Sequence, residues 1–179
     1  GQKIITHNDI GILAVTGSSE TTRSINKQVA HKKYALILEG QGNNTVIVDN
    51  SGVETFKKYA EQAFFGMGGR RCTTTHNAFM TKELFNYSLE FAKNVAKNKY
   101  GFLENERTLI GPHASQRERE SLAQYSNQFK DKDVDYHRFH RILPSEYTGG
   151  FFSDITLIQH KSLGSLANMG PFGPTINIV

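Results

Sequence analysis

Ile10-Gly-Ile-Leu-Ala-Val-Thr16-Gly17-Ser18-Ser19 is the stretch that decides the fold. Its short apolar run predicts a buried strand, and the strand ends in a Gly-Ser-Ser turn. Residues 20–31 then predict a helix with Ser18 or Ser19 as its N-cap. A second apolar run, Tyr34-Ala-Leu-Ile-Leu38, predicts another buried strand. This order of strand, turn, helix and strand indicates an α/β fold.

The same alternation continues along the rest of the chain. Further strands are predicted over 45–48, 73–79, 141–143 and 155–158, and further helices over 53–65, 82–97 and 115–129. We therefore expect an α/β fold with a mostly parallel sheet flanked by helices. The 179 residues are enough for one ordinary domain with its own core.

Composition narrows the class of protein. Apolar residues make up 37% and charged residues 21% of the chain, which is a globular balance. The net charge is +4, but the basic residues are scattered, so nucleic acid is not an expected partner. No apolar run approaches the roughly 18 residues of a membrane span. The single cysteine rules out an internal disulfide and a multi-cysteine zinc site, and no metal is expected. A reducing location, cytosol or mitochondrial matrix, is the expectation.

Two features follow predicted strands, where α/β folds place their ligands. The backbone N–H groups of Gly17-Ser18-Ser19 suit a phosphate at a helix N-terminus, although an ordinary capped turn has the same composition. Glu39 comes directly after a buried strand. Its carboxylate is either a surface end-cap or a positioned base.

A third feature is Gly68-Gly69-Arg70-Arg71-Cys72-Thr73-Thr74-Thr75. Most lone cysteines are buried and behave as small hydrophobes. Cys72 instead follows a glycine-rich break and two arginines and precedes three threonines. Cations near the sulfur would lower the pKa of the thiol and populate the reactive thiolate. Cys72 is therefore a candidate nucleophile.

Histidines are also candidates for chemistry. His137 and His140 have a three-residue spacing that could place two metal ligands on one helical face, but a surface segment is the better explanation of them. His76 lies four residues beyond Cys72 on a predicted strand, and no role is assigned to it.

Six motifs resemble, in order along the chain, those of the aldehyde dehydrogenase superfamily. They are Thr16-Gly17-Ser18, Leu38-Glu39-x-x-Gly42, Phe65-x-x-x-Gly69-x-x-Cys72, Ile110-Gly111-Pro112, Gly150-Phe151-Phe152 and Phe172-Gly173-Pro174. Arg71-Cys72-Thr73-Thr74-Thr75, together with Gly42-Asn43-Asn44, most resembles the antiquitin-type branch, which oxidises α-aminoadipic semialdehyde.

The resemblance implies a division of the chain. Residues 1–42 would be the last strand-helix-strand of a dinucleotide-binding domain, and 43–179 a catalytic domain that carries the cysteine. The main cofactor-binding half would lie upstream, so binding of NAD or NADP is expected to require it. The partners implied are a small-molecule aldehyde and the remainder of the enzyme or partner subunits, with a homo-oligomer at full length.

The resemblance also implies a role for each site residue. Cys72 would attack an aldehyde to give a thiohemiacetal, and hydride transfer to the nicotinamide would leave a thioester. Glu39 would activate the water that hydrolyses this thioester. The cofactor would lie near a set of four residues, Gly17, Ser18, Gly40 and Phe172. Arg71 would line the aldehyde tunnel and suit a substrate with a distant carboxylate.

Three departures from the family pattern leave a second hypothesis open. Arg70 stands where the family has Gln or Glu, Thr22 where it has a packing glycine, and Gly170 where it has a ribose-binding glutamate. The alternative is a catalytically degenerate module of the same fold that acts as a structural or interaction subunit of a larger assembly.

Overall fold

The computed structural model describes residues 1–102, 106–129, 133–143, 145, 149–162 and 172–179. The chain divides into two compact units, residues 1–42 and 43–179. Each unit has its own apolar cluster, so each is described by itself. Among the described residues, no helix combines the length and the apolarity needed to cross a membrane.

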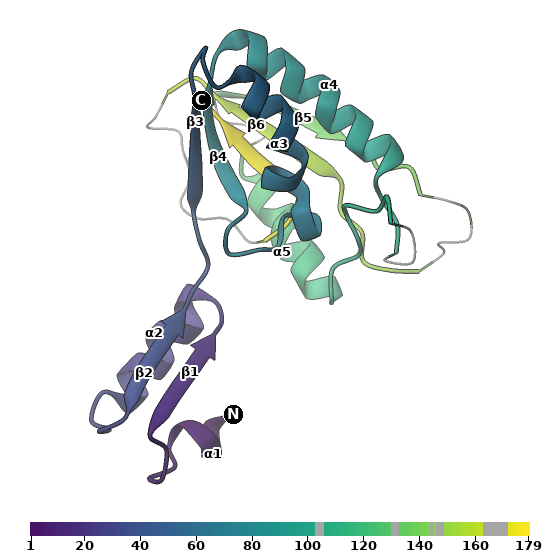
Figure 1. Ribbon diagram of the computed structural model, residues 1–179. Coiled ribbons are helices and arrows are strands. Elements are labelled where there is room, and N and C mark those ends of the chain that lie inside the picture. Colours follow the sequence, from purple (N-terminus) through teal and green to yellow (C-terminus); the bar gives the residue numbers. More distant parts are fainter. Residues whose placement is uncertain (103–105, 130–132, 144, 146–148, 163–171) are drawn as a thin grey trace. The chain divides into compact units, whose positions relative to one another are not determined.

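The first unit is a strand-helix-strand preceded by a short helix (Figure 1). Its elements are α1 (Gln2–Ile5), β1 (Ile12–Thr16), α2 (Ser19–Val29) and β2 (Ala35–Glu39). The two strands pair in parallel, from Ile12 opposite Ala35 to Thr16 opposite Glu39. Since side chains alternate along a strand, Leu13 packs in the cluster with Val29, while Ile12 and Ile37 are exposed on the other face.

The second unit is built on a five-stranded sheet in the order β3-β4-β7-β6-β5. The strands are β3 (Asn44–Val48), β4 (Thr75–Met80), β5 (Val134–Phe139), β6 (Ile155–His160) and β7 (Thr175–Ile178). All neighbouring pairs are parallel except β5 and β6, which are antiparallel. The predicted α/β fold with a mostly parallel sheet flanked by helices is confirmed.

Helices α3 (Val53–Phe65) and α4 (Lys82–Asn98) cover one face of this sheet (Figure 1). They form the main core with alternate side chains of β6 and β7, among them Leu157 and Ile176. The phenylalanines of α3 and α4 meet edge to face or tilted, as Phe64 does with Phe91. Each such fully buried side chain stabilises the fold by about 1.5–3 kcal/mol.

Helix α5 (Gln116–Asn127) packs against the opposite, more polar side chains of the sheet. Ser126 Oγ lies 3.4 Å from Thr175 Oγ1, and the Asn177 amide donates to Tyr125 Oη at 3.3 Å. Asn177 Oδ1 also lies 2.9 Å from His160 Nε2. The polar groups buried under α5 thus satisfy one another across the sheet.

Two predicted strands differ from the observed ones. The strand expected at 141–143 is absent: the Arg141 backbone N–H donates to Asp154 and that of Ile142 to Ala96. The strand of this region is β5, which begins at Val134, seven residues before the predicted start at Arg141. The strand expected from residue 73 begins only at Thr75, because a turn occupies the residues before it.

The helical face considered for His137 and His140, and set aside in favour of a surface segment, does not form, since His137 lies in strand β5. His140 Nδ1 lies 3.0 Å from Asp154 Oδ2 instead. Among the described residues, no group of three or more histidine, cysteine or carboxylate side chains is arranged to hold a metal ion.

Candidate active site

Cys72 lies on a tight turn just before β4. The Thr74 N–H donates to the Arg71 carbonyl at 3.1 Å, and the Arg71 N–H donates to Thr74 Oγ1 at 3.2 Å. Thr74 is buried, with 4% of its surface exposed, whereas Cys72 is exposed. The turn therefore anchors one end in the protein and presents the thiol to solvent, where an electrophile can reach it.

Asn44, the first residue of β3, fastens this turn to the sheet. Its Nδ2 donates to the Cys72 carbonyl at 2.6 Å and to the Thr74 carbonyl at 3.0 Å. One amide thus holds the backbone on both sides of Thr73. From the sequence, Asn44 was noted only as part of the Gly42-Asn43-Asn44 motif. Its contact with the cysteine turn was not predicted.

The glycine-rich break before Cys72 forms a 3-10 turn, Gly66–Gly69, with left-handed backbone inside it. Met67 has φ 56°, Gly68 φ 68° and Gly69 φ 72°. A Cβ on Gly69 would lie 2.4 Å from the Gly173 carbonyl oxygen, so only glycine fits there. The Gly173 N–H donates to the Gly69 carbonyl at 3.1 Å. Backbone contact therefore joins the cysteine segment to the Phe172-Gly173-Pro174 segment.

Arg70 is engaged in holding this loop. Its Nε donates to the Met67 carbonyl at 3.1 Å and its Nη1 to the Pro112 carbonyl at 2.8 Å. The residue that departs from the family pattern before the cysteine thus binds two backbone carbonyls and ties the break to the Ile110-Gly111-Pro112 segment.

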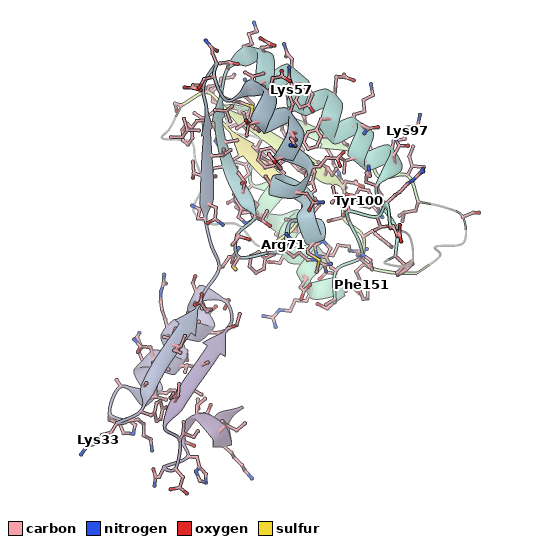
Figure 2. The ribbon with its side chains drawn as sticks, in the orientation of Figure 1. Lys33, Lys57, Arg71, Lys97, Tyr100 and Phe151 are labelled. Carbon is pink, nitrogen blue, oxygen red and sulfur yellow. The ribbon has the colours of Figure 1, made fainter. Side chains whose placement is uncertain are left out.

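Arg71, which is labelled in Figure 2, is exposed. A Cβ added to Gly66 would lie 3.6 Å from Arg71 Nη1. The Arg71 guanidinium therefore lies over Gly66, and it has room there because Gly66 has no side chain. An exposed guanidinium at this position can pair with a carboxylate.

His76 lies on β4, next to the Phe172 segment. The two rings stack with centroids 6.4 Å apart and an interplanar angle of 28°. His76 is 7% exposed, and its Nε2 has no hydrogen-bond partner among the described residues. Burial lowers the pKa of His76, which favours the neutral imidazole. The sequence assigned this residue no role, and the structure makes it a support for Phe172.

The first unit gathers the other predicted residues at the ends of β1 and β2. The Gly17 N–H donates to the Glu39 carbonyl at 3.0 Å, and Ser18 Oγ accepts from the Thr21 N–H at 3.1 Å, which caps α2. Gly40 lies close to the start of the same helix, since a Cβ added to it would lie 3.8 Å from Ser19 Oγ. These residues thus surround a helix N-terminus, which attracts anions.

Thr22, which stands where the family has a packing glycine, fits into this arrangement. It is buried, and its hydroxyl donates to the Ser18 and Ser19 carbonyls at 3.2 Å each. The predicted residues accordingly form two groups, one in each unit: Gly17, Ser18, Glu39 and Gly40 in the first, and Arg71, Cys72 and Phe172 in the second. Gly170 lies outside the described residues.

Comparison with known proteins gives one consistent family. The model of the aldehyde dehydrogenase family matches residues 1–179. The chain is 26% identical over 125 residues to 5-carboxymethyl-2-hydroxymuconate semialdehyde dehydrogenase of Escherichia coli, covering 70% of this chain and 26% of that protein. It is 28% identical over 114 residues to aldehyde dehydrogenase family 7 member A1 of Brassica napus, covering 63% of this chain and 23% of that protein.

Solved structures agree in fold. An NAD+ complex of aldehyde dehydrogenase from Bacillus cereus superposes with a TM-score of 0.84 at 22% identity, over 99% of this chain and 36% of that one. A proline utilization A variant from Bradyrhizobium japonicum superposes with a TM-score of 0.81 at 25% identity, over 99% of this chain and 18% of that one. The chain thus spans about a quarter of the length of the curated relatives it matches.

Proposed function

Because this chain belongs to the aldehyde dehydrogenase family, we propose that it carries the nucleophile and the base for NAD(P)-dependent oxidation of an aldehyde to a carboxylic acid. The observation that carries the proposal is the setting of Cys72. Its exposed thiol lies on a turn that Asn44 holds to the sheet, and the glycine break before it contacts Gly173.

The proposed reaction begins at the sulfur. The Cys72 thiolate attacks the carbonyl carbon, an S–C bond forms, and the carbonyl electron pair moves onto oxygen. The Cys72 backbone N–H helps to hold this oxyanion. The cofactor, when bound, accepts the hydride that leaves the thiohemiacetal carbon. A thioester on Cys72 remains.

Glu39 acts in the second half. Its carboxylate takes a proton from water, and the hydroxide attacks the thioester carbon. The C–S bond breaks, the carboxylic acid departs, and Cys72 returns to the thiolate. Glu39 suits this role because it is exposed and ends a strand, so water reaches it.

The residues proposed for the cofactor fit its chemistry. Gly17 and Ser18 lie at the N-terminus of α2, where the helix dipole favours the phosphates of NAD or NADP. Gly40 lies beside the same helix end. Phe172, held by His76, would meet the nicotinamide ribose. The main dinucleotide-binding half is proposed to come from the rest of the polypeptide, in a homo-oligomer of the cytosol or mitochondrial matrix.

Arg71 is proposed to select the aldehyde. It precedes Cys72 in the sequence, and its exposed guanidinium would pair with a carboxylate at the far end of the substrate. The Escherichia coli relative is named for a carboxymethyl-bearing semialdehyde, which accords with this assignment. The antiquitin-type substrate proposed from the sequence also carries a distant carboxylate.

Arg70 and Thr22 are compatible with the proposed enzyme. Both side chains make hydrogen bonds within their own unit, so these departures from the family pattern are accommodated locally. Neither residue needs a larger assembly to explain it.

Steady-state kinetics of the full-length protein test the proposal. Aldehyde-dependent formation of reduced cofactor is expected, with a loss of about a thousandfold or more in Cys72→Ala. Thr73→Ala, on the same exposed turn, is the matched control and should retain activity. Absence of activity and of NAD(P) binding in the wild-type protein would instead support the structural module.

A further inference from the structure

A polar pocket of about 390 Å³ lies between α5 and the start of β6. Its lining contains residues of α5, β5 and the segment before β6, and none from the Cys72 turn. This volume is at the lower end of the range for small-molecule sites. The pocket therefore has room for a ligand that the proposed oxidation does not use.

Asp154 organises the cationic wall of this pocket. Its side chain is 5% exposed. Oδ2 accepts from Arg138 Nε at 2.9 Å and lies 2.8 Å from Arg138 Nη2, and Oδ1 accepts from Arg141 Nη1 at 2.7 Å and from the Arg141 backbone N–H at 3.2 Å. One buried carboxylate thus fixes two guanidinium groups in place.

These guanidinium groups have donors to spare. Among the described residues, Arg141 Nε is buried and has no hydrogen-bond partner. Nε and Nη2 of Arg138 both contact a single carboxylate oxygen of Asp154. The hydrogens on Arg138 Nη1 can therefore donate to a ligand. Arg119, from α5, lines the same pocket and is half-buried. The charged side chains of the lining are these three arginines against Glu120 and Asp154, so the pocket is net cationic.

We propose that this pocket binds a small organic oxyanion, a carboxylate or a phosphate, through Arg119 and the guanidinium groups that Asp154 positions. The planar guanidinium fork matches both kinds of head group, and donors already fixed by a buried carboxylate lose little entropy on binding. The inference goes beyond the proposed oxidation and does not depend on it.

Titration of the full-length protein with inorganic phosphate and with succinate, at constant ionic strength, tests the site. Binding would be followed by calorimetry and by amide chemical shifts of α5 and β5. Arg119→Gln removes one donor from a side chain that is half-buried, and binding should weaken about tenfold. Arg117→Gln is the matched control: it loses the same charge from the same helix, but Arg117 is exposed and does not line the pocket.

Saturable binding of either probe that Arg119→Gln weakens and Arg117→Gln preserves supports the proposal. Saturation by succinate alone identifies a carboxylate ligand, and by phosphate alone a phosphoryl ligand. The proposal is overturned if neither probe saturates, or if both variants weaken binding equally, because diffuse attraction to a basic helix would then explain it. Since no aldehyde or nicotinamide is present, failure here leaves the proposed oxidation standing.

Discussion

At the residue scale, one side-chain amide ties the cysteine turn to the sheet. Asn44 Nδ2 bridges the Cys72 and Thr74 carbonyls, so it sets the direction in which the thiol and the Cys72 N–H point. Small displacements of reacting groups cost large factors in rate. Asn44 is therefore a positioning residue in the proposed reaction.

Asn44→Ala is expected to lower kcat about 10- to 100-fold, with little change in KM for the cofactor. Asn50→Ala, at an exposed turn residue, should leave both constants unchanged. Stopped-flow measurement of the hydride-transfer burst separates orientation from folding. Equal kcat in the two variants would contradict the role given to Asn44.

Arg71 gives a second prediction at this scale. Arg71→Gln should raise KM about tenfold for an aldehyde with a distal carboxylate and leave KM unchanged for a neutral aldehyde of similar length. The neutral substrate serves as the internal control. An equal rise for both aldehydes would show that Arg71 acts on the loop rather than on the substrate.

The residues predicted from sequence are those that short motifs mark, such as Cys72, Glu39 and Gly17. Their catalytic and binding roles stay predictions. The sequence missed Asn44, Asp154 and His76 because their partners are far away in the chain. Only the folded sheet brings β3 beside β4, or Phe172 beside β4, and no local spacing encodes such pairs.

At the scale of elements, the glycine break and the Phe-Gly-Pro segment are held together by backbone contact. Gly69→Ala should destabilise the protein by about 2–4 kcal/mol, since it combines a left-handed backbone with overlap against the Gly173 carbonyl. Gly149→Ala has open space and is the matched control. Urea unfolding measures both, and equal stability of the two variants would refute the contact.

The segment joining β5 to β6 should give acid-dependent stability. Burial alone would raise the pKa of Asp154, but hydrogen bonds from Arg141 and the charges of Arg141 and Arg138 outweigh it and lower the pKa. A folded-state pKa below the unfolded value means that the stabilisation is present above about pH 4 and is lost as pH falls through the lowered pKa.

Asp154→Asn should therefore cost about 2 kcal/mol at neutral pH, and the difference from wild type should shrink below pH 4. The free energy of unfolding as a function of pH checks this. Asp133→Asn, whose side chain is 83% exposed, should change stability little at any pH. A pH-independent difference for Asp154→Asn would contradict the account.

Helices were easier to predict than strands. Apolar side chains at helical spacing give α3 and most of α4, because long amphipathic faces leave a clear period. β5 was missed because charged and aromatic side chains interrupt its alternation, and β7 because it has only four residues. The apolar run at 141–143 was wrongly predicted to be a strand, since Asp154 captures the Arg141 N–H.

At the scale of the whole molecule, the two units differ in what holds them together. Residues 43–179 have a large aromatic and aliphatic core, whereas the cluster of 1–42 has only Ile5, Leu13 and Val29 as buried members. Ile12 and Ile37 leave the other face of its small sheet uncovered within the unit. A piece of about 40 residues rarely folds without further support.

Residues 43–179 expressed alone should therefore melt cooperatively, and residues 1–42 alone should not. Circular dichroism during heating of the two pieces distinguishes these outcomes. A cooperative transition in the isolated 1–42 piece would contradict the comparison. The assignment of 1–42 to the end of a dinucleotide-binding domain is a separate prediction, since it rests on resemblance rather than on stability.

In the proposed reaction, Cys72 forms the covalent intermediate and Glu39 resolves it. The most direct measurement is peptide mapping by mass spectrometry of the full-length Glu39→Gln variant after incubation with NAD(P)+ and an aldehyde. We expect an acyl group on the Cys72 peptide, formed with one equivalent of reduced cofactor, and no such group in Glu20→Gln after turnover is complete. An unmodified Cys72 peptide, with acid still produced, would contradict it.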